Sequence, residues 1–336
     1  MPEEVVSTEQ LEQRLAPLYK RLRLPEGRLE LMSGIRERRF FPAGTRPSEI
    51  SIATADKAIE QSGLPRSEFG ACLHGSVCRD FLEPATACRV HHELGLPNEC
   101  VVQDLSNACL GVLSGMLQIA TMIELGQITA GVVVGTELGR ELVENTIEAL
   151  NSDESLTRDT VKNSIASLTI GSASAAVVLC HESLAPGIAR LEASTVYADT
   201  RHHGLCQSEG LTHVMHTDSE QLMRAGVAAG AENFDRLLAA AEWNREQIDH
   251  TFCHQVGSAH RKMMLEQLGL PLERDFATLE WLGNTGSAAL PSALSLGIEK
   301  QLMSDGDRVA LLGIGSGVNC LMMAVRWGAE PYPTKD

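Results

Sequence analysis

The sequence lacks a long hydrophobic run and the features of an export signal. No run of about 18 apolar residues occurs, and the first residues, MPEEVVSTEQLEQRL, are acidic rather than basic. A membrane span needs about 20 apolar residues, and a secretory signal needs a basic segment followed by an apolar one. We therefore expect a chain that neither inserts into a membrane nor is exported.

Paired cysteine motifs and metal-ligand spacings are missing as well. The nine cysteines are an odd number and no two form C-x-x-C. Most lie in apolar or small-residue runs such as GACLHGS, as expected of reduced, buried thiols in the cytoplasm. The pairs His91–His92 and His202–His203 have neither helical i, i+4 spacing nor accompanying thiols. We expect no disulfide framework and no metal.

An excess of positive charge is also absent. The net charge of −16 disfavours nucleic acids and acidic proteins as partners. Residues 20–39 are an exception, because they carry seven of the 28 basic side chains, Arg36 and Arg38 among them. Two interpretations stay open for this stretch: a solvated surface, or a landing site for a phosphorylated ligand.

What the chain does have is alternation. Its 336 residues are 43% hydrophobic, enough for a large core. Short apolar runs alternate with amphipathic or small-residue helical stretches such as 50–63 and 227–243, which predicts an α/β fold with buried, mixed sheets. The expected strands are 70–76, 100–105, 130–136, 174–180, 250–255, 308–315 and 319–325.

Two pairs of segments recur at nearly the same spacing. Asn107 and Asn284 each stand between a strand and a small-residue helix, 177 residues apart. His74 and His254 each end a strand, 180 residues apart. Two matched pairs at nearly one offset indicate an internal duplication.

We therefore expect two halves, residues 1–183 and 184–336. No low-complexity or proline-rich spacer separates them. The halves should pack together, with the functional site where their equivalent elements converge.

The strand-to-helix turn of the first half carries Cys109, in the stretch N-A-C-L-G-V-L-S-G-M. Unpaired amides and the dipole at a helix N-terminus stabilise a thiolate and lower a thiol pKa from about 8.5 to roughly 3.5–7.5. Small neighbours allow another molecule to approach. Cys109 is thus a candidate nucleophile; an inert core thiol is the alternative.

His254 and Asn284 are candidate hydrogen-bond donors from the second half. A neutral imidazole and a side-chain amide can stabilise an oxyanion or enolate. A backbone amide in the turn G-I-G-S-G-V-N, at Gly315 and Ser316, could serve a second oxyanion opposite the Cys109 amide. Ordinary structural roles remain open: a strand-end histidine, a helix N-cap and a tight turn.

These segments resemble the ketoacyl-synthase III branch of the thiolase superfamily. The resemblance is carried by DLSNACLG, HQVGSAHR, GNTGSAALP, DRVALLGIGSGVN and the early SGIRERRF, and it covers nearly the whole chain. It implies a thiolase fold of five layers, αβαβα, and a homodimer. It also implies an acyltransferase in which acyl-CoA acylates Cys109, while His254 and Asn284 support a carbon–carbon condensation.

The same resemblance implies no cofactor beyond coenzyme A as substrate carrier. Its phosphate contacts would be Arg36, Arg38 and Arg261.

Within this branch, SVCRDFLEPATAC is similar to enzymes that begin long-chain olefin biosynthesis. In the fatty-acid-initiating synthases a large apolar residue usually occupies the position of Glu83, which lies 26 residues before Cys109. Joining two ordinary fatty acyl-CoAs requires removal of an α-proton, and a desolvated carboxylate could remove it. The alternative for Glu83 is a solvent-facing residue before Pro84 and the next helix.

The sequence therefore favours a non-decarboxylative Claisen condensation of two fatty acyl-CoAs to a 2-alkyl-3-oxoacyl product, with enzymes of the same pathway as further partners. Two alternatives stay open. One is a ketoacyl-synthase III that extends acyl-CoA with malonyl carrier protein. The other is a non-catalytic scaffold subunit, against which the intact Cys109, His254 and Asn284 argue.

Overall fold

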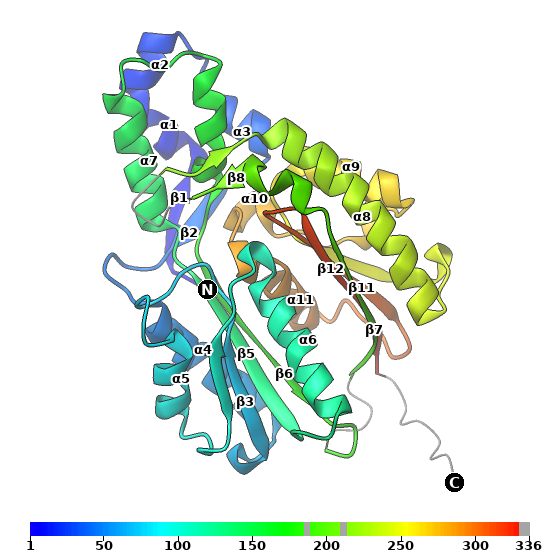
Figure 1. The fold of residues 1–336 in the computed structure, drawn as a ribbon. Helices are drawn as coiled ribbons and strands as arrows, with labels where there is room; N and C mark the ends of the chain where they lie inside the picture. The colour runs from blue at the N-terminus through cyan, green and yellow to red at the C-terminus, as the bar shows by residue number, and fades with distance from the viewer. Residues whose placement is uncertain (185–188, 209–213, 329–336) are drawn as a thin grey trace.

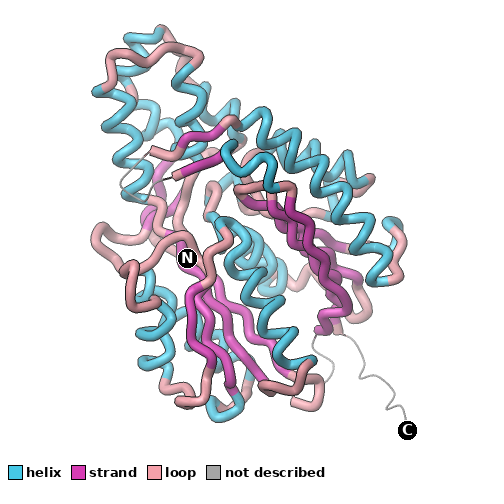
Figure 2. Tube along the Cα trace, viewed as in Figure 1, coloured by secondary structure: helices cyan, strands magenta, loops and turns pink. Residues whose placement is uncertain are grey.

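Two four-stranded mixed sheets form the framework of the chain (Figures 1 and 2). The structure is a computed structural model that describes residues 1–184, 189–208 and 214–328. One sheet has the strand order β4-β3-β5-β6 and the other the order β10-β11-β12-β7. The α/β class predicted from the alternation of segments is confirmed.

The first sheet contains two parallel pairs and one antiparallel pair. β3 runs parallel to both β4 and β5, whereas β6 runs antiparallel to β5. Its strands are β3 (Phe69–His74), β4 (Val101–Asp104), β5 (Ala130–Glu137) and β6 (Ala173–Cys180). The helices of this part are α4 (Pro47–Ser62), α5 (Thr86–Leu94), α6 (Gly111–Glu124) and α7 (Arg140–Ser152).

The second sheet contains one parallel pair and two antiparallel pairs. β10 runs parallel to β11, and β12 runs antiparallel to both β11 and β7. Its strands are β7 (Ala189–Ala198), β10 (His250–Cys253), β11 (Arg308–Gly315) and β12 (Asn319–Trp327). Its helices are α8 (Ser219–Ala241), α9 (Ser258–Leu268), α10 (Leu279–Leu282) and α11 (Ala289–Glu299).

Helices supply three further layers. α4 and α5 cover the outer face of the first sheet, where Ile59 and Val90 pack on Val132. α8 and α9 cover the outer face of the second sheet in the same way. α6 and α11 lie between the sheets in one apolar core that includes Met116 and Leu290 (Figure 1). The predicted order αβαβα is confirmed.

A smaller layer of short elements covers one end of the molecule. β1 (Glu4–Ser7) pairs antiparallel with β2 (Glu37–Phe40), and α7 packs against the helices between them. The remaining short elements are α1 (Thr8–Arg14), α2 (Ala16–Leu22), α3 (Arg28–Ser33), β8 (Cys206–Gln207) and β9 (His216–Thr217). Across the described residues, every helix is too short or too polar to cross a membrane.

Each half presents the same sequence of turns. A 3-10 turn, η2 (Ala108–Leu110), leads into α6, and another, η7 (Gly286–Ala288), leads into α11. β10 also makes a parallel bridge from Thr251 to Asp275 on the side where β3 pairs with β4. These correspondences agree with the predicted duplication. The predicted junction at residues 183 and 184 borders positions 185–188, which lie outside the described residues.

Candidate active site

Cys109 occupies the turn between the first sheet and the central helix layer. β4 ends at Asp104, Cys109 is the middle residue of η2, and α6 begins two residues later. The preceding Ala108 has φ +44°, a left-handed conformation that costs free energy in a residue with a Cβ. Strain of this kind persists only where surrounding contacts hold it, and it is concentrated at functional sites.

The C-terminal turn lies directly against Cys109. A Cβ placed on Gly315 would stand 3.6 Å from the Cys109 backbone nitrogen. The backbone N–H of Ser316 reaches the Cys109 thiol. Asn319 Nδ2 also donates to Asn107 Oδ1 at 3.5 Å, which links the turn to the residue two before Cys109. The structure thus brings Gly315 and Ser316 beside Cys109.

Cys109 is partly exposed as a residue, but its thiol is buried. Burial raises its pKa to about 12, the nearby carboxylate of Glu137 adds to the rise, and the backbone N–H groups of Ser316 and Cys109 oppose it. The expectation of a lowered pKa is therefore wrong for this structure. Loss of solvation outweighs the helix N-terminus, because an apolar surrounding penalises the charged thiolate.

Asn284 stands at the matching turn of the second half, and η7 packs against η2. Its backbone bridges Thr169 and Gly171, with N–H···O distances of 2.9 Å each. Its side-chain Oδ1 accepts a hydrogen bond from the Gly286 N–H at 3.0 Å. Nδ2 makes no hydrogen bond within the described residues, so this amide donor is available to a bound molecule.

His254 follows β10 and is buried, with 6% of its surface exposed. Its backbone N–H donates to the Leu312 carbonyl at 3.0 Å. Leu312 lies on β11, the strand that ends at the turn beside Cys109. Burial lowers the pKa of His254 to about 3, so the imidazole is neutral at pH 7. Both ring nitrogens are buried and make no hydrogen bond within the described part of the chain.

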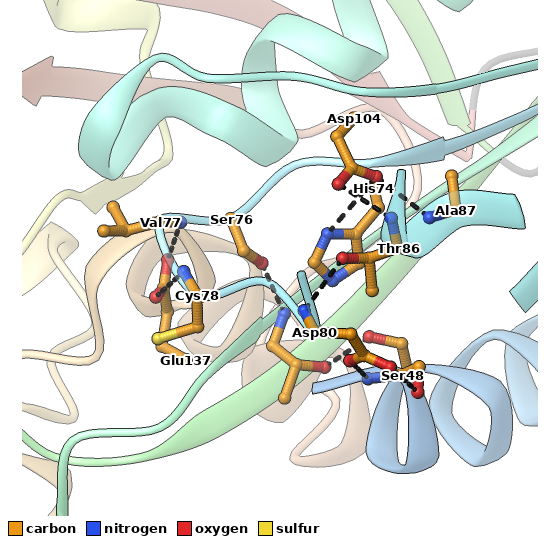
Figure 3. Close-up of polar contacts among 12 residues, drawn as sticks. Ser48, His74, Ser76, Val77, Cys78, Asp80, Thr86, Ala87, Asp104 and Glu137 are labelled. Carbon is orange, nitrogen blue, oxygen red and sulfur yellow. Dashed lines mark hydrogen bonds and ion pairs between the residues drawn. The ribbon is translucent and has the colours of Figure 1, made fainter. Parts of the chain in front are cut away.

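Glu83 lies on the loop between the end of β3 and the start of α5. Figure 3 shows the polar contacts at the base of this loop. The base of the loop is anchored: Asp80 accepts from Ser48 N and Oγ at 2.9 and 2.6 Å. Asp104 accepts from the first amides of α5. The tip of the loop is exposed to solvent: Leu82 is 90% exposed and Phe81 is 51% exposed. Glu83 itself is exposed.

The three arginines named as phosphate contacts differ in accessibility. Arg36 has an exposed side chain 3.2 Å from Glu280. Arg261 donates to the buried carboxylate of Asp275 at 2.5 Å. Arg38 is 1% exposed, and its guanidinium donates to Thr8 Oγ1 and to the Leu168 carbonyl at 2.9 and 3.1 Å. A phosphate could not reach Arg38, which corrects the expectation for that residue.

Glu137, a second carboxylate of the site, is not among the candidate residues that the sequence indicated. It ends β5, is 5% exposed, and lies close enough to Cys109 to raise the pKa of that thiol. The signal was an acidic residue closing the otherwise small and apolar strand AGVVVGTE. Among the described residues, no three His, Cys, Asp or Glu side chains gather as metal ligands would.

Two family models match the chain. Residues 38–169 match the thiolase N-terminal domain, and residues 238–327 match the C-terminal part of 3-oxoacyl-[acyl-carrier-protein] synthase III. Together they include the positions of Glu83, Cys109, His254 and Asn284.

Curated relatives align along nearly the whole chain. An acyl-CoA:acyl-CoA alkyltransferase from Shewanella oneidensis is 43% identical, covering 96% of this chain and 95% of the relative. One from Xanthomonas campestris pv. campestris is 32% identical, covering 96% and 94%. A β-ketoacyl-[acyl-carrier-protein] synthase III from Bacillus cereus is 26% identical, covering 98% and 96%.

Solved structures of Xanthomonas campestris OleA have the same architecture. One superimposes with a TM-score of 0.93 at 31% identity, covering 97% of this chain and 94% of the other. OleA has been solved with a cysteine, a glutamate and a histidine individually replaced, and with cerulenin bound. The replaced glutamate precedes the replaced cysteine by 26 positions, the spacing between Glu83 and Cys109 here.

Proposed function

Because the chain belongs to the acyl-CoA:acyl-CoA alkyltransferase (OleA) family of the thiolase superfamily, we propose that it joins two fatty acyl-CoAs by non-decarboxylative Claisen condensation. The observation that carries the proposal is the meeting of three elements at Cys109: its own turn, the Ser316 amide and the turn of Asn284. Together they surround one sulfur atom with donors suited to a thioester oxygen.

In the first step, Cys109 Sγ attacks the carbonyl carbon of one acyl-CoA. The C–S bond to coenzyme A breaks, free coenzyme A leaves, and an acyl-Cys109 thioester remains. Because the thiol pKa is about 12, the proton must be lost as the attack occurs. We assign the neutral imidazole of His254 as the relay that takes this proton and passes it to the departing coenzyme A sulfur. Its pKa of about 3 means that it does not keep the proton as an imidazolium.

In the second step, a base removes an α-proton from a second acyl-CoA. The carbanion attacks the carbonyl of acyl-Cys109, and the C–S bond to Cys109 breaks. A 2-alkyl-3-oxoacyl-CoA is released and the thiolate recovers a proton. The Asn284 amide, whose Nδ2 is unpaired within the described residues, would donate to the enolate or oxyanion that forms in this step.

We assign the base to Glu83, supplied by a second copy of the chain. The exposure of Glu83 in the single chain argues against a place in its own, densely surrounded Cys109 site. The loop also exposes Val77 by 53% as well as Phe81 and Leu82, and such apolar groups are typical of a surface that is covered by a partner. A homodimer would cover them and desolvate Glu83.

The remaining parts of the proposal concern the substrate carrier and the location. Arg36 is accessible to a phosphate of coenzyme A, and Arg261 is partly so. No cofactor beyond the acyl-CoA carrier enters these steps. Free thiols at all nine cysteines suit the reducing cytoplasm, where acyl-CoA and the later pathway enzymes would also be found.

A ketoacyl-synthase III activity is the second candidate. The C-terminal family match and the Bacillus cereus relative favour it. A malonyl substrate forms its own carbanion by losing carbon dioxide, so that reaction needs no carboxylate at position 83. The net charge of −16 also disfavours docking of an acidic carrier protein. A non-catalytic scaffold has no use for this donor set around a thiol.

One assay separates these functions. The purified protein is given a long-chain acyl-CoA alone, and coenzyme A release, acyl-Cys109 and products are followed by mass spectrometry. We expect an acyl-Cys109 adduct and a 2-alkyl-3-oxoacyl product. Product that appears only with malonyl carrier protein would establish the synthase III activity instead. If no adduct forms on Cys109, the non-catalytic scaffold would be the remaining function.

A further inference from the structure

The buried carboxylate of Glu137 connects two loops of the proposed site. Figure 3 shows its contacts with one of them, at Val77 and Cys78. Its Oε1 accepts from the Val77 N–H at 3.1 Å and its Oε2 from the Cys78 N–H at 3.3 Å. Its Oε1 also accepts from the Ser287 N–H at 3.2 Å and from Ser287 Oγ at 2.5 Å. Within the described residues one side chain thus binds backbone from both halves of the molecule.

Each of the two segments that donate to Glu137 is close in sequence to a residue that the proposed function uses. Val77 and Cys78 begin the loop that carries Glu83 at its exposed tip. Ser287 is three residues beyond Asn284 in the turn whose Gly286 N–H holds the Asn284 side chain. A Cβ on Gly286 would lie 3.1 Å from Glu137 Cδ, so the turn packs closely on the carboxylate.

These contacts suit an ionised carboxylate. Its partners among the described residues are all neutral donors, and an ionised carboxylate can accept several such bonds. Burial raises the pKa of Glu137, while the bonds from Ser287, Val77 and Cys78 oppose the rise. The charge also acts on Cys109, whose pKa it raises.

We propose that Glu137 is a positioning residue for condensation, which holds the Glu83 loop and the Asn284 turn at fixed places around Cys109. The role rests on the proposed function, since both residues act in its second step. Acylation of Cys109 uses neither Glu83 nor Asn284 in that scheme. Loss of Glu137 should therefore slow condensation far more than acylation.

The test uses the whole 336-residue chain and three variants. Glu137→Gln keeps the shape of the side chain but removes its charge and one acceptor. Ser287→Ala removes the hydroxyl bond to the second half and keeps the charge. Glu148→Gln, on the exposed face of α7, is the matched control. Single-turnover acylation, condensation rate, the pH dependence of Cys109 alkylation and thermal unfolding are measured for each.

We expect Glu137→Gln to lower condensation by about 10- to 100-fold, the range for losing a charged hydrogen bond or displacing a reacting group. Acylation should change much less. Alkylation of Cys109 should shift to lower pH in Glu137→Gln, because a neighbouring negative charge is gone, and stay in place in Ser287→Ala. Ser287→Ala should slow condensation as well, and Glu148→Gln should match the parent.

Two results would overturn the role. One is unchanged condensation in Glu137→Gln and Ser287→Ala while the parent condenses normally. The other is an equal fall of acylation and condensation together with a lower unfolding temperature, which would mean a structural cross-link alone. A parent that acylates Cys109 but never condenses would instead refute the proposed function and, with it, this role. The alkylation shift would still report the contact between Glu137 and Cys109.

Discussion

Gly75 and Gly111 meet backbone to backbone beside the candidate nucleophile. A Cβ placed on Gly75 would stand 2.4 Å from the carbonyl carbon and oxygen of Gly111, and one placed on Gly111 would stand 2.5 Å from those of Gly75. Real Cβ contacts are never this short, so neither residue can be replaced without movement of the main chain. The contact sets the first turn of α6, which begins two residues after Cys109, against the end of β3.

Replacing Gly111 by alanine should therefore destabilise the fold and displace Cys109. We expect a loss of about 1–3 kcal/mol in the free energy of unfolding, the usual cost of overpacking, and slower acylation. Urea unfolding and single-turnover acylation would measure the two effects. Gly204→Ala is the control for stability, because a Cβ there meets no atom within 4 Å. An unchanged unfolding midpoint in Gly111→Ala would contradict the close contact.

The raised pKa of Cys109 predicts an unusual pH profile for its reaction with iodoacetamide. The thiol pKa is about 12 in the folded site, so the thiolate fraction should grow about tenfold per pH unit throughout the accessible range. Alkylation at Cys109, quantified by mass spectrometry between pH 6 and 10, should rise without levelling. A plateau below pH 8 would mean that the helix N-terminus dominates instead.

The same pKa shift makes a prediction about stability. A folded-state pKa above the unfolded value means that the folded protein holds the Cys109 proton more tightly. The stabilising contribution of the neutral thiol is full below the unfolded pKa of about 8.5 and is lost as pH rises from there toward 12. Cys109→Ser, which stays neutral, should flatten the alkaline part of the stability curve. An unchanged curve would contradict the shift.

Replacing Asn284 by alanine should separate the two chemical steps. Removal of one donor to a developing oxyanion typically costs about 100- to 1,000-fold in rate. Condensation should fall by this amount, whereas acylation of Cys109 should persist. Asn98→Ala, at an exposed position between α5 and β4, controls for loss of an amide. Equal losses in both steps would assign Asn284 to the structure of the turn.

Glu83 can be tested for action across a dimer by mixing two inactive variants. Glu83→Gln should acylate Cys109 but not condense, and Cys109→Ala should do neither. In a mixed dimer, an intact Glu83 from one chain would face an intact Cys109 in the other, so condensation should return. Glu93→Gln, exposed on α5, is the charge control. No recovery in dimers proven to be mixed would place the base in the same chain or exclude it.

Leu82→Glu should prevent the proposed dimer from forming. Leu82 is 90% exposed at the tip of the loop, and a charge there would be costly to bury against a second copy. Sedimentation analysis should show a dimer for the parent and a monomer for the variant. Leu125→Glu, at a position 68% exposed next to the end of α6, should leave the association state unchanged. A monomeric parent would refute the dimer.

Strands that contain a run of apolar residues could be predicted from the sequence, whereas strands of mixed composition could not. The predicted strands include β4 and β6, although both are only partly buried. β5 and β11 are runs of small and branched apolar residues, and they lie where expected. β7 was not expected, because its sequence ARLEASTVYA mixes charged and apolar residues and its burial changes along its length. Such a segment forms a strand because it pairs with β12, which lies 120 or more residues away in the sequence.

The site divides in the same way. Cys109, Gly315, Ser316 and the turn of Asn284 meet because duplicated elements converge, which the two repeated spacings indicated. The sequence did not indicate which individual charged side chains are buried. Arg38 belongs to a basic stretch in the sequence but points into the core, and Glu137 follows an apolar strand yet accepts bonds from distant loops. Both depend on contacts across the fold rather than on neighbouring residues.

Because the exposed tip of the loop carries Glu83, the condensation activity of the proposed enzyme should depend on the concentration of the protein. Acylation needs one chain, but condensation would need two, so dilution below the dissociation constant of the dimer should stop the reaction after its first half. Acyl groups would then remain on Cys109. At low expression a cell would accumulate acylated monomer that cannot condense. Output would rise with the square of protein concentration until the dimer saturates.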